Sequence, residues 1–203
     1  MRSSVFLITG FPGTGKLTVA RALAARLEAD GETTLIIDNH WINNPIFGLI
    51  DQDGLTPLPP QVWDRVGEIA LAVVKTAEEL TPRNWNVIFT AYLDGVTDTG
   101  WVPRLAEVAE TRGASFTPVR LLCDTDEIAR RAMSPERRDL MKSVDPDDPH
   151  LLAAKGPVYD SGHGNTLALD ITTLPPAEAA AHILAHREEI DAGFVLANLP
   201  DPA

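Results

Sequence analysis

The sequence predicts an α/β fold in which helices cover both faces of a five-stranded parallel sheet. Five short β-rich runs alternate with helical patterns along the chain, which is the order that a parallel sheet requires. A glycine-rich loop joins the first run to the first helical pattern, at the edge where open parallel sheets bind ligands. The 203 residues, 44% of them apolar, are enough for one core. We therefore expect a single domain over residues 1–203.

The first half of the chain contains two strand patterns and two helical patterns. Residues 5–8 form an apolar run of strand length, and apolar residues recur at helical spacing over 16–28. Residues 33–37 form a second β-rich run. The segment 41–60 is rich in Gly, Pro and Asn, which predicts irregular structure. An amphipathic helix opened by prolines follows over 62–80.

The second half continues the alternation of strands and helices. Residues 87–93 and 117–123 predict the third and fourth strands, and the helical pattern between them, 103–112, stops at a glycine. Residues 167–171 predict the fifth strand, and an Ala-rich helix is expected over 175–190. No internal repeat is visible in the sequence, so a fold made of repeated structural units is not expected.

The charge of the chain limits the partners that it can bind. Lys and Arg total 17 against 29 Asp and Glu, which gives a formal charge of −12 and a pI of about 4.7. Nucleic acid and anionic membranes would be repelled overall, so we expect neither as a partner. An anionic ligand would need a local cluster of cations. The single cysteine, Cys123, excludes an internal disulfide, and a cytoplasmic location is the simplest expectation.

The glycine-rich loop at residues 10–18, "GFPGTGKLT", has the pattern of a phosphate-binding site. Its backbone N–H groups can turn inward around phosphate oxygens, with a helix N-terminus behind them and Lys16 as a mobile cation. Such loops usually place Ser or Thr directly after the lysine. Here that position is Leu17, and the hydroxyl comes one residue later at Thr18. The alternative is a glycine turn that binds nothing.

The loop resembles that of adenylate kinase and related nucleoside monophosphate kinases, whose pattern reads G-x-P-G-x-G-K-G-T, with Leu17 in place of their glycine. The resemblance implies a three-layer P-loop NTPase fold with a helical lid, and ATP with Mg²⁺ as cofactors. It places Thr18 near the α- and β-phosphates and makes it the candidate metal ligand. The residues implied in cofactor binding are Gly10, Gly13, Thr14, Gly15, Lys16, Leu17 and Thr18, and Lys16 is also implied in catalysis.

Polar residues follow the second predicted strand, where an acceptor would lie beside ATP. The layout resembles shikimate kinase and chloramphenicol phosphotransferase, in which an Asp at this place handles the proton of the acceptor hydroxyl. That resemblance makes Asp38 a catalytic candidate, and His40 is the second candidate base because imidazole titrates near neutral pH. The alternatives are a carboxylate that caps a turn and a histidine that packs at the surface.

A cluster of cations follows the fourth predicted strand and predicts a lid at about residues 130–150. A movable arginine segment can neutralise a transferring phosphoryl group and exclude water. By resemblance to the lid of these kinases, Arg130 or Arg131 would contact adenine, and Arg137 or Arg138 would act in catalysis on the phosphates. The alternative is a solvated basic helix. Five cations fall within thirteen residues: Arg130, Arg131, Arg137, Arg138 and Lys142.

The acceptor pocket is expected between the second and third strands. Trp41 and Asn43 would combine an apolar wall with an amide, and together with His40 they are predicted to bind substrate. Thr90 and Tyr92 follow the third strand and belong to the same set, although both fit equally well as inward strand residues. Asp94 also follows the third strand. That strand does not end in the acidic residue that related kinases have there, so the sequence does not favour Asp94 as a metal ligand. For Trp41 and Asn43, the alternative is a loop that packs against the protein and binds no substrate.

These observations predict an ATP-dependent phosphotransferase that moves the γ-phosphoryl group to a hydroxyl of a small molecule. Between Asp38 and Asn84 the only arginines are Arg65 and Arg83, which favours a neutral acceptor such as a nucleoside, sugar, cyclitol or antibiotic. The alternatives are a nucleoside monophosphate kinase and a non-catalytic protein that binds ATP or sequesters a ligand. A GTPase switch is disfavoured because no NKxD motif is present.

Overall fold

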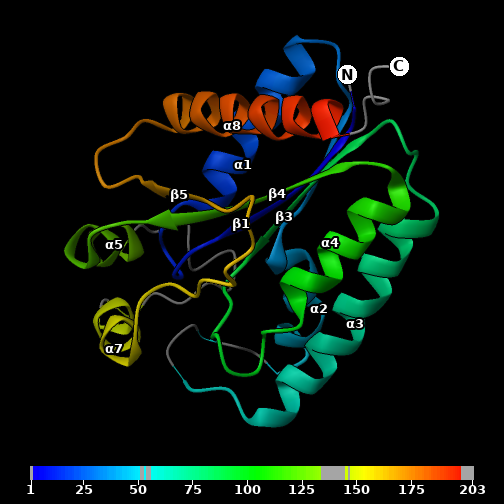
Figure 1. The fold of residues 1–203 in the computed structure, drawn as a ribbon. Coiled ribbons are helices and arrows are strands. Elements are labelled where there is room, and N and C mark those ends of the chain that lie inside the picture. The colour runs from blue at the N-terminus through cyan, green and yellow to red at the C-terminus, as the bar shows by residue number, and fades with distance from the viewer. Residues whose placement is uncertain (1, 51–52, 54–55, 134–144, 146, 198–203) are drawn as a thin grey trace, which may run out of the picture.

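The structure, a computed structural model, describes residues 2–50, 53, 56–133, 145 and 147–197. Its centre is one parallel sheet in the order β2-β3-β1-β4-β5 (Figure 1). The predicted five-stranded α/β architecture is therefore confirmed. The strands are β1 (Ser4–Thr9), β2 (Thr34–Ile37), β3 (Asn86–Ala91), β4 (Ser115–Leu122) and β5 (Leu167–Asp170).

Helices cover both faces of the sheet and also its carboxyl end. α1 and α8 pack together on one face, α3 and α4 lie on the other, and α5 and α7 pack against each other beyond the strand ends (Figure 1). No helix among the residues that the structure describes is both long and apolar enough to span a membrane. The helices are α1 (Lys16–Ala29), α2 (Asn39–Phe47), α3 (Pro60–Glu79), α4 (Trp101–Arg112), α5 (Thr125–Ala132), α7 (Asp148–Lys155) and α8 (Pro176–Ala197).

The central strand β1 explains why both faces of the sheet are covered. Alternate side chains of a strand point to opposite faces. Val5 and Leu7 enter the core beneath α3 and α4, whereas Phe6 and Ile8 enter the core beneath α1 and α8. All four are at most 1% exposed. A continuous apolar run is the expected signature of a strand that is buried on both sides.

The register of the strands sets where the polar loops emerge. Ile8 of β1 pairs with Thr90 of β3, and Ile37 of β2 pairs with Phe89. The loops after β1, β2 and β3 therefore leave the sheet at one edge. Because neighbouring strands lie roughly 5 Å apart, β2 and β1 are about 10 Å apart at this edge.

Two segments are more regular than the sequence predicts. The start of the segment 41–60 belongs to α2, which begins after Asp38 in an extended cap conformation and buries Ile42 and Phe47. Burial of these side chains outweighs the poor helix propensity of the Asn and Pro residues. The end of the predicted lid at about residues 130–150 likewise lies in a helix, α7, which begins at Asp148 and has a proline in its first turn.

Candidate active site

The phosphate loop connects β1 to α1 and has the backbone that its glycines predict. Gly13 and Gly15 have φ values of 92° and 105°, a region that side chains resist. A Cβ atom at Gly10 would lie 2.9 Å from the carbonyl oxygen of Leu121 on β4. Glycine is therefore required at these positions for conformation or for space, and the loop can curl tightly above the end of β1.

Two side chains hold this loop closed. Thr14 is fully buried, and its hydroxyl donates a 2.7 Å hydrogen bond to the carbonyl of Phe11. The Lys16 ammonium donates 2.9 Å hydrogen bonds to the carbonyls of Gly10 and Phe11. Thr18 is exposed in the first turn of α1. A cation and a hydroxyl thus stand at the N-terminus of a helix, where anions are stabilised.

Arg131 of α5 ties the phosphate loop to the loop after β5. Its guanidinium donates to the carbonyl of Thr14 at 2.8 Å and to those of Ile171 and Thr172 at 3.3 and 3.1 Å. Its Nε also donates to Glu127 at 2.7 Å. This four-way contact brings α5 to the rim of the phosphate loop.

Arg130 lies differently from its neighbour. It is 69% exposed, and its guanidinium donates two hydrogen bonds to Glu127. Hydrogen bonds from Arg130 and Arg131 lower the pKa of Glu127 to about 2, so this carboxylate stays ionised at neutral pH. Of the two arginines predicted to reach the nucleotide, Arg131 is the one beside the phosphate loop.

Asp38 follows β2 and occupies the N-cap position of α2, where its side chain makes no capping hydrogen bond but contacts neighbouring residues. The hydroxyl of Thr90 on β3 donates to Asp38 Oδ1 at 2.6 Å and accepts from the backbone N–H of Asn39 at 3.2 Å. His40 Nδ1 lies 3.4 Å from Asp38 Oδ2. Both side chains are largely buried, with 17% and 23% exposed for Asp38 and His40. The carboxylate is thus fixed in orientation at the edge where the phosphate loop emerges.

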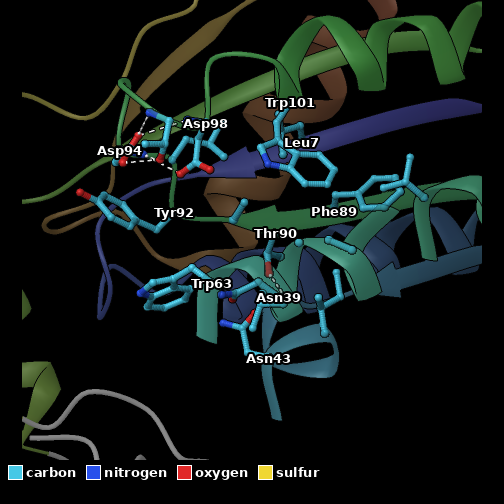
Figure 2. A pocket seen from close by; sticks show the side chains of 18 of the residues that line it. Leu7, Asn39, Asn43, Trp63, Phe89, Thr90, Tyr92, Asp94, Asp98 and Trp101 are labelled. Atoms are coloured by element: carbon cyan, nitrogen blue, oxygen red, sulfur yellow. Dashed lines mark hydrogen bonds between the residues drawn. The ribbon is translucent and has the colours of Figure 1, made fainter. Parts of the chain in front are cut away.

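A cavity of about 760 Å³ opens beside Asn39 and Thr90, a volume suited to a small organic molecule. Figure 2 shows Asp98 and Trp101 on one side of it and Trp63, Asn39 and Asn43 on the other. Polar and aromatic side chains of the cavity come from α2, α3, β3, the loop before α4, α4 and α7: Asn39, Asn43, Trp63, Asp64, Phe89, Thr90, Tyr92, Asp94, Thr97, Asp98, Trp101 and Lys155.

Only some of the residues that were predicted to bind the acceptor line this cavity. Asn43, Thr90 and Tyr92 line it, whereas Trp41 is 65% exposed and is not among the lining side chains. His40 stands behind the lining, next to Asp38. α2 causes this division, because its turn sends Asn43 inward and Trp41 outward.

Two aromatic rings join the phosphate loop to the cavity. Phe11 of the loop is 7% exposed, and its ring centroid lies 6.1 Å from that of Tyr92. Phe11 also belongs to a small apolar cluster with Ile128 of α5 and Val158. The phosphate loop and the cavity are therefore neighbours that share one wall.

The loop between β3 and α4 carries two acids with different surroundings. Burial opposes ionisation of Asp94, but the hydroxyl of Thr97 and three backbone N–H groups donate to it and lower its pKa. The pKa of Asp98 is raised by burial and by the neighbouring Asp94 charge. Asp94 therefore organises the loop, while Asp98 faces the cavity as a half-buried acid.

Sequence reasoning missed three residues that line the cavity, Trp63, Asp98 and Trp101. Trp63 is 50% exposed and stands beside the apolar stripe of α3. A tryptophan outside the buried stripe of a helix is a signal that could have found it. Asp98 and Trp101 give no such signal, because the loop hydrogen bonds that position Asp98 depend on Asp94.

The catalytic prediction for Arg137 and Arg138 falls on residues 134–144, which lie outside the described residues, as does Lys142. The predicted lid is therefore described at its two ends, by α5 before the segment and by α7 after it. Both ends pack against each other. The two helices flank the shared wall of the phosphate loop and the cavity.

Comparison with known proteins gives likenesses to kinases. No family model matches the chain. Over 135 residues it is 27% identical to the "Probable adenylyl-sulfate kinase" of Bacillus subtilis (strain 168), an alignment that covers 64% of this chain and 59% of that protein. The chain thus spans about three fifths of the length of this relative.

Two solved structures share the fold over nearly the whole chain. A gluconokinase from Sinorhizobium meliloti 1021 has a TM-score of 0.65 at 16% identity, with 98% of each chain covered. An APS kinase from Mycobacterium tuberculosis, solved with AMPPNP and APS, has a TM-score of 0.59 at 17% identity, with 92% of this chain and 98% of that chain covered. These likenesses show that the chain has the same fold as the two solved kinases.

Proposed function

We propose that the protein transfers the γ-phosphoryl group of ATP to a hydroxyl of a small molecule. One observation carries the proposal. The phosphate loop and Asp38, whose carboxylate accepts a hydrogen bond from Thr90, both follow strands at the same edge of the sheet, next to a cavity of about 760 Å³. About 10 Å separates their strands, which is room for a terminal phosphate and an acceptor hydroxyl. The likeness to kinases supports the same reaction class.

The nucleotide half of the reaction rests on the phosphate loop. Its N–H groups and Lys16 would bind the phosphates, with Arg131 at the rim of the loop. The exposed hydroxyl of Thr18 and the phosphates themselves fit Mg²⁺, which usually takes few protein ligands beside a nucleotide. When bound, the metal ion neutralises charge on the phosphate oxygens.

The acceptor half of the reaction rests on Asp38. The acceptor oxygen forms a bond to the γ-phosphorus, the bond from that phosphorus to the bridging oxygen breaks, and ADP leaves with the electron pair. The hydroxyl proton passes to the Asp38 carboxylate. The hydrogen bond from Thr90 to Oδ1 and the 3.4 Å approach of His40 Nδ1 to Oδ2 keep the carboxylate oriented for this role.

A nucleotide acceptor is the second candidate, favoured by the likeness to proteins described as adenylyl-sulfate and APS kinases. Trp63 and Trp101 could stack on a base. The charges argue against it. Neither Arg65 nor Arg83 is among the residues that line the cavity. Arg65 pairs with Glu68, and Arg83 donates a hydrogen bond to the carbonyl of Thr111.

The experiment is acceptor-dependent ADP release, measured with Mg-ATP and a panel of sugars, amino sugars, nucleosides, gluconate and APS. Once an acceptor is found, Asp38→Asn should lower kcat at least about a hundredfold, because a positioned base typically contributes that much. ATP binding, measured by calorimetry, should change by less than about threefold.

Glu68→Gln is the matched control, because it removes an exposed carboxylate of α3 that does not line the cavity. Its kcat should equal that of the wild type. The proposal fails if the wild type binds no Mg-ATP, or if Asp38→Asn keeps full acceptor-dependent turnover. ATP binding without turnover for any acceptor would instead favour a protein that sequesters its ligand.

A further inference from the structure

We propose that the acceptor carries a protonated amine beside an apolar ring or chain. This inference rests on the proposed function and specifies its substrate class. Among the described side chains that line the cavity, three are carboxylates, Asp64, Asp94 and Asp98, and one is a cation, the exposed Lys155. A cavity of this charge attracts cations and disfavours phosphorylated or carboxylated acceptors.

Asp98 is the carboxylate that an ammonium group would meet. Asp94 already accepts hydrogen bonds from Thr97 and from three backbone N–H groups of its own loop. Asp98 accepts one bond from the loop, from the backbone N–H of Asp94 to Oδ2 at 3.1 Å. The half-buried Asp98 carboxylate therefore keeps acceptor capacity for a ligand. Its raised pKa has the same origin, since burial without a cation disfavours the charged form.

Asn43 supplies an independent observation at the opposite side of the cavity. It is only 7% exposed, and its amide makes no hydrogen bond to any residue that the structure describes. Figure 2 shows this side chain directed toward the cavity that it lines. The residue as a whole is buried, but its amide group is open to the cavity and keeps its donors and acceptor for a ligand. A hydroxyl or carbonyl of a bound acceptor would satisfy the amide.

Aromatic rings account for the apolar part of the acceptor. Trp63 is 50% exposed at the cavity, and Trp101 and Tyr92 line it from other elements. Rings at such positions bind apolar rings by stacking and cations by their electron-rich faces. Trp101 and Asp98 lie on the same side of the cavity (Figure 2), so the amine would sit between a ring and a carboxylate.

The arrangement fixes the order of groups along the acceptor. The amine lies at the Asp98 side, the apolar part between the tryptophans, and the reactive hydroxyl near Thr90, which adjoins Asp38. Amino alcohols with a ring and amino sugars have this order. The gluconate and APS of the structural relatives would bring an anion to a wall of carboxylates.

The test measures binding with matched pairs of compounds, by calorimetry in the presence of Mg-AMPPNP. The pairs are tyramine with N-acetyltyramine and D-glucosamine with N-acetyl-D-glucosamine, and gluconate and APS are the anionic probes. In at least one pair the amine should bind about tenfold more tightly than its acetylated partner, as expected for a hydrogen bond between charged groups. Asp98→Asn should remove this preference, whereas Glu68→Gln should preserve it.

Failure of this inference can be told apart from failure of the proposed function. If Mg-AMPPNP does not bind, the proposed function falls and the inference falls with it. If Mg-AMPPNP binds but no amine binds better than its acetylated partner, or the anionic probes bind best, the inference alone is overturned. The wild-type comparison decides this even if Asp98→Asn does not fold, and thermal unfolding identifies that case.

Discussion

The nucleotide side and the acceptor side of this active site are built in different ways. On the nucleotide side, Lys16, Thr14 and Arg131 all donate hydrogen bonds to backbone carbonyls of loops. On the acceptor side, the cavity is lined by side chains, and the amide of Asn43 has no partner among the described residues. One side is held together by bonds to backbone carbonyls, and the other presents Asn43 and Asp98 to the cavity with hydrogen-bonding capacity left for a ligand.

This difference explains how one fold can serve many acceptors. Contacts that depend on backbone geometry need only the glycines and a lysine, and such a loop recognises phosphate in any nucleotide. Contacts that depend on side chains change with each substitution in α2, α3 and the loop before α4. The likeness to kinases at 16% and 17% identity shows a shared fold, and the side chains that line the cavity can differ within that fold.

The largest expected effect is the loss of the phosphate-binding cation. Lys16→Ala removes two hydrogen bonds that close the loop and the positive charge for the phosphates. We expect kcat/KM for ATP turnover to fall at least about a thousandfold, near the upper range for a single electrostatic contact. The measurement is acceptor-dependent ADP release.

Lys75→Ala is the matched control for this change. Lys75 is 68% exposed and pairs only weakly with Glu79 along α3, at 3.8 Å, and surface pairs of this kind contribute little. Its turnover should match that of the wild type. Wild-type turnover in Lys16→Ala would contradict the assignment of the nucleotide side.

A smaller effect is expected where the two sides meet, at Thr90. Thr90→Val keeps the shape of a side chain that is 3% exposed but removes the donor to Asp38. The carboxylate then loses one charge-assisted hydrogen bond, so we expect kcat to fall about tenfold. ATP affinity should change by less than twofold, because the phosphate loop is untouched. Steady-state kinetics and calorimetry measure the two quantities.

Thr117→Val provides the control for removing a buried strand hydroxyl. Thr117 is fully buried on β4, and its hydroxyl has no hydrogen-bond partner among the described residues. Its replacement should leave kcat unchanged and keep or raise thermal stability. Equal losses of kcat in both variants would mean that the effect at Thr90 is one of general packing, not of the Asp38 carboxylate.

The nucleotide side is the part of the site that the sequence could predict. The pattern of residues 10–18 encodes backbone geometry directly, since Gly13 and Gly15 occupy angles that other residues avoid. Asp38 could be placed at the sheet edge because it directly follows a strand run. The five strands follow from the alternation of apolar runs, which is a local property.

The acceptor side could be predicted only in part. Asn43 and Thr90 line the cavity as expected, but Trp41 lies outside it because α2 forms where irregular chain is predicted. One turn of helix decides which side chain faces inward, and burial against α3 stabilises that turn. Asp98 was missed because its position depends on hydrogen bonds within its own loop, which composition does not reveal.

The smallest effect is expected at the rim of the phosphate loop, where two adjacent arginines can be compared. Arg131→Lys keeps the charge but loses the planar fork that reaches the carbonyls of Thr14 and Thr172. We expect the Kd for Mg-AMPPNP to rise about fivefold, the equivalent of one net hydrogen bond. Arg130→Lys should change this Kd by less than twofold, because Arg130 is 69% exposed and bonded to Glu127.

The comparison between these variants separates position from charge. Both keep a cation on α5 and both lose guanidinium hydrogen bonds to Glu127, so a general electrostatic role would leave both Kd values unchanged. A role through the backbone of the phosphate loop moves only the value for Arg131→Lys. If Arg130→Lys weakens Mg-AMPPNP binding more than Arg131→Lys does, the contact to Thr14 is not what prepares the loop, and the nucleotide side would then depend on the guanidinium bonds to Glu127 rather than on bonds between loops.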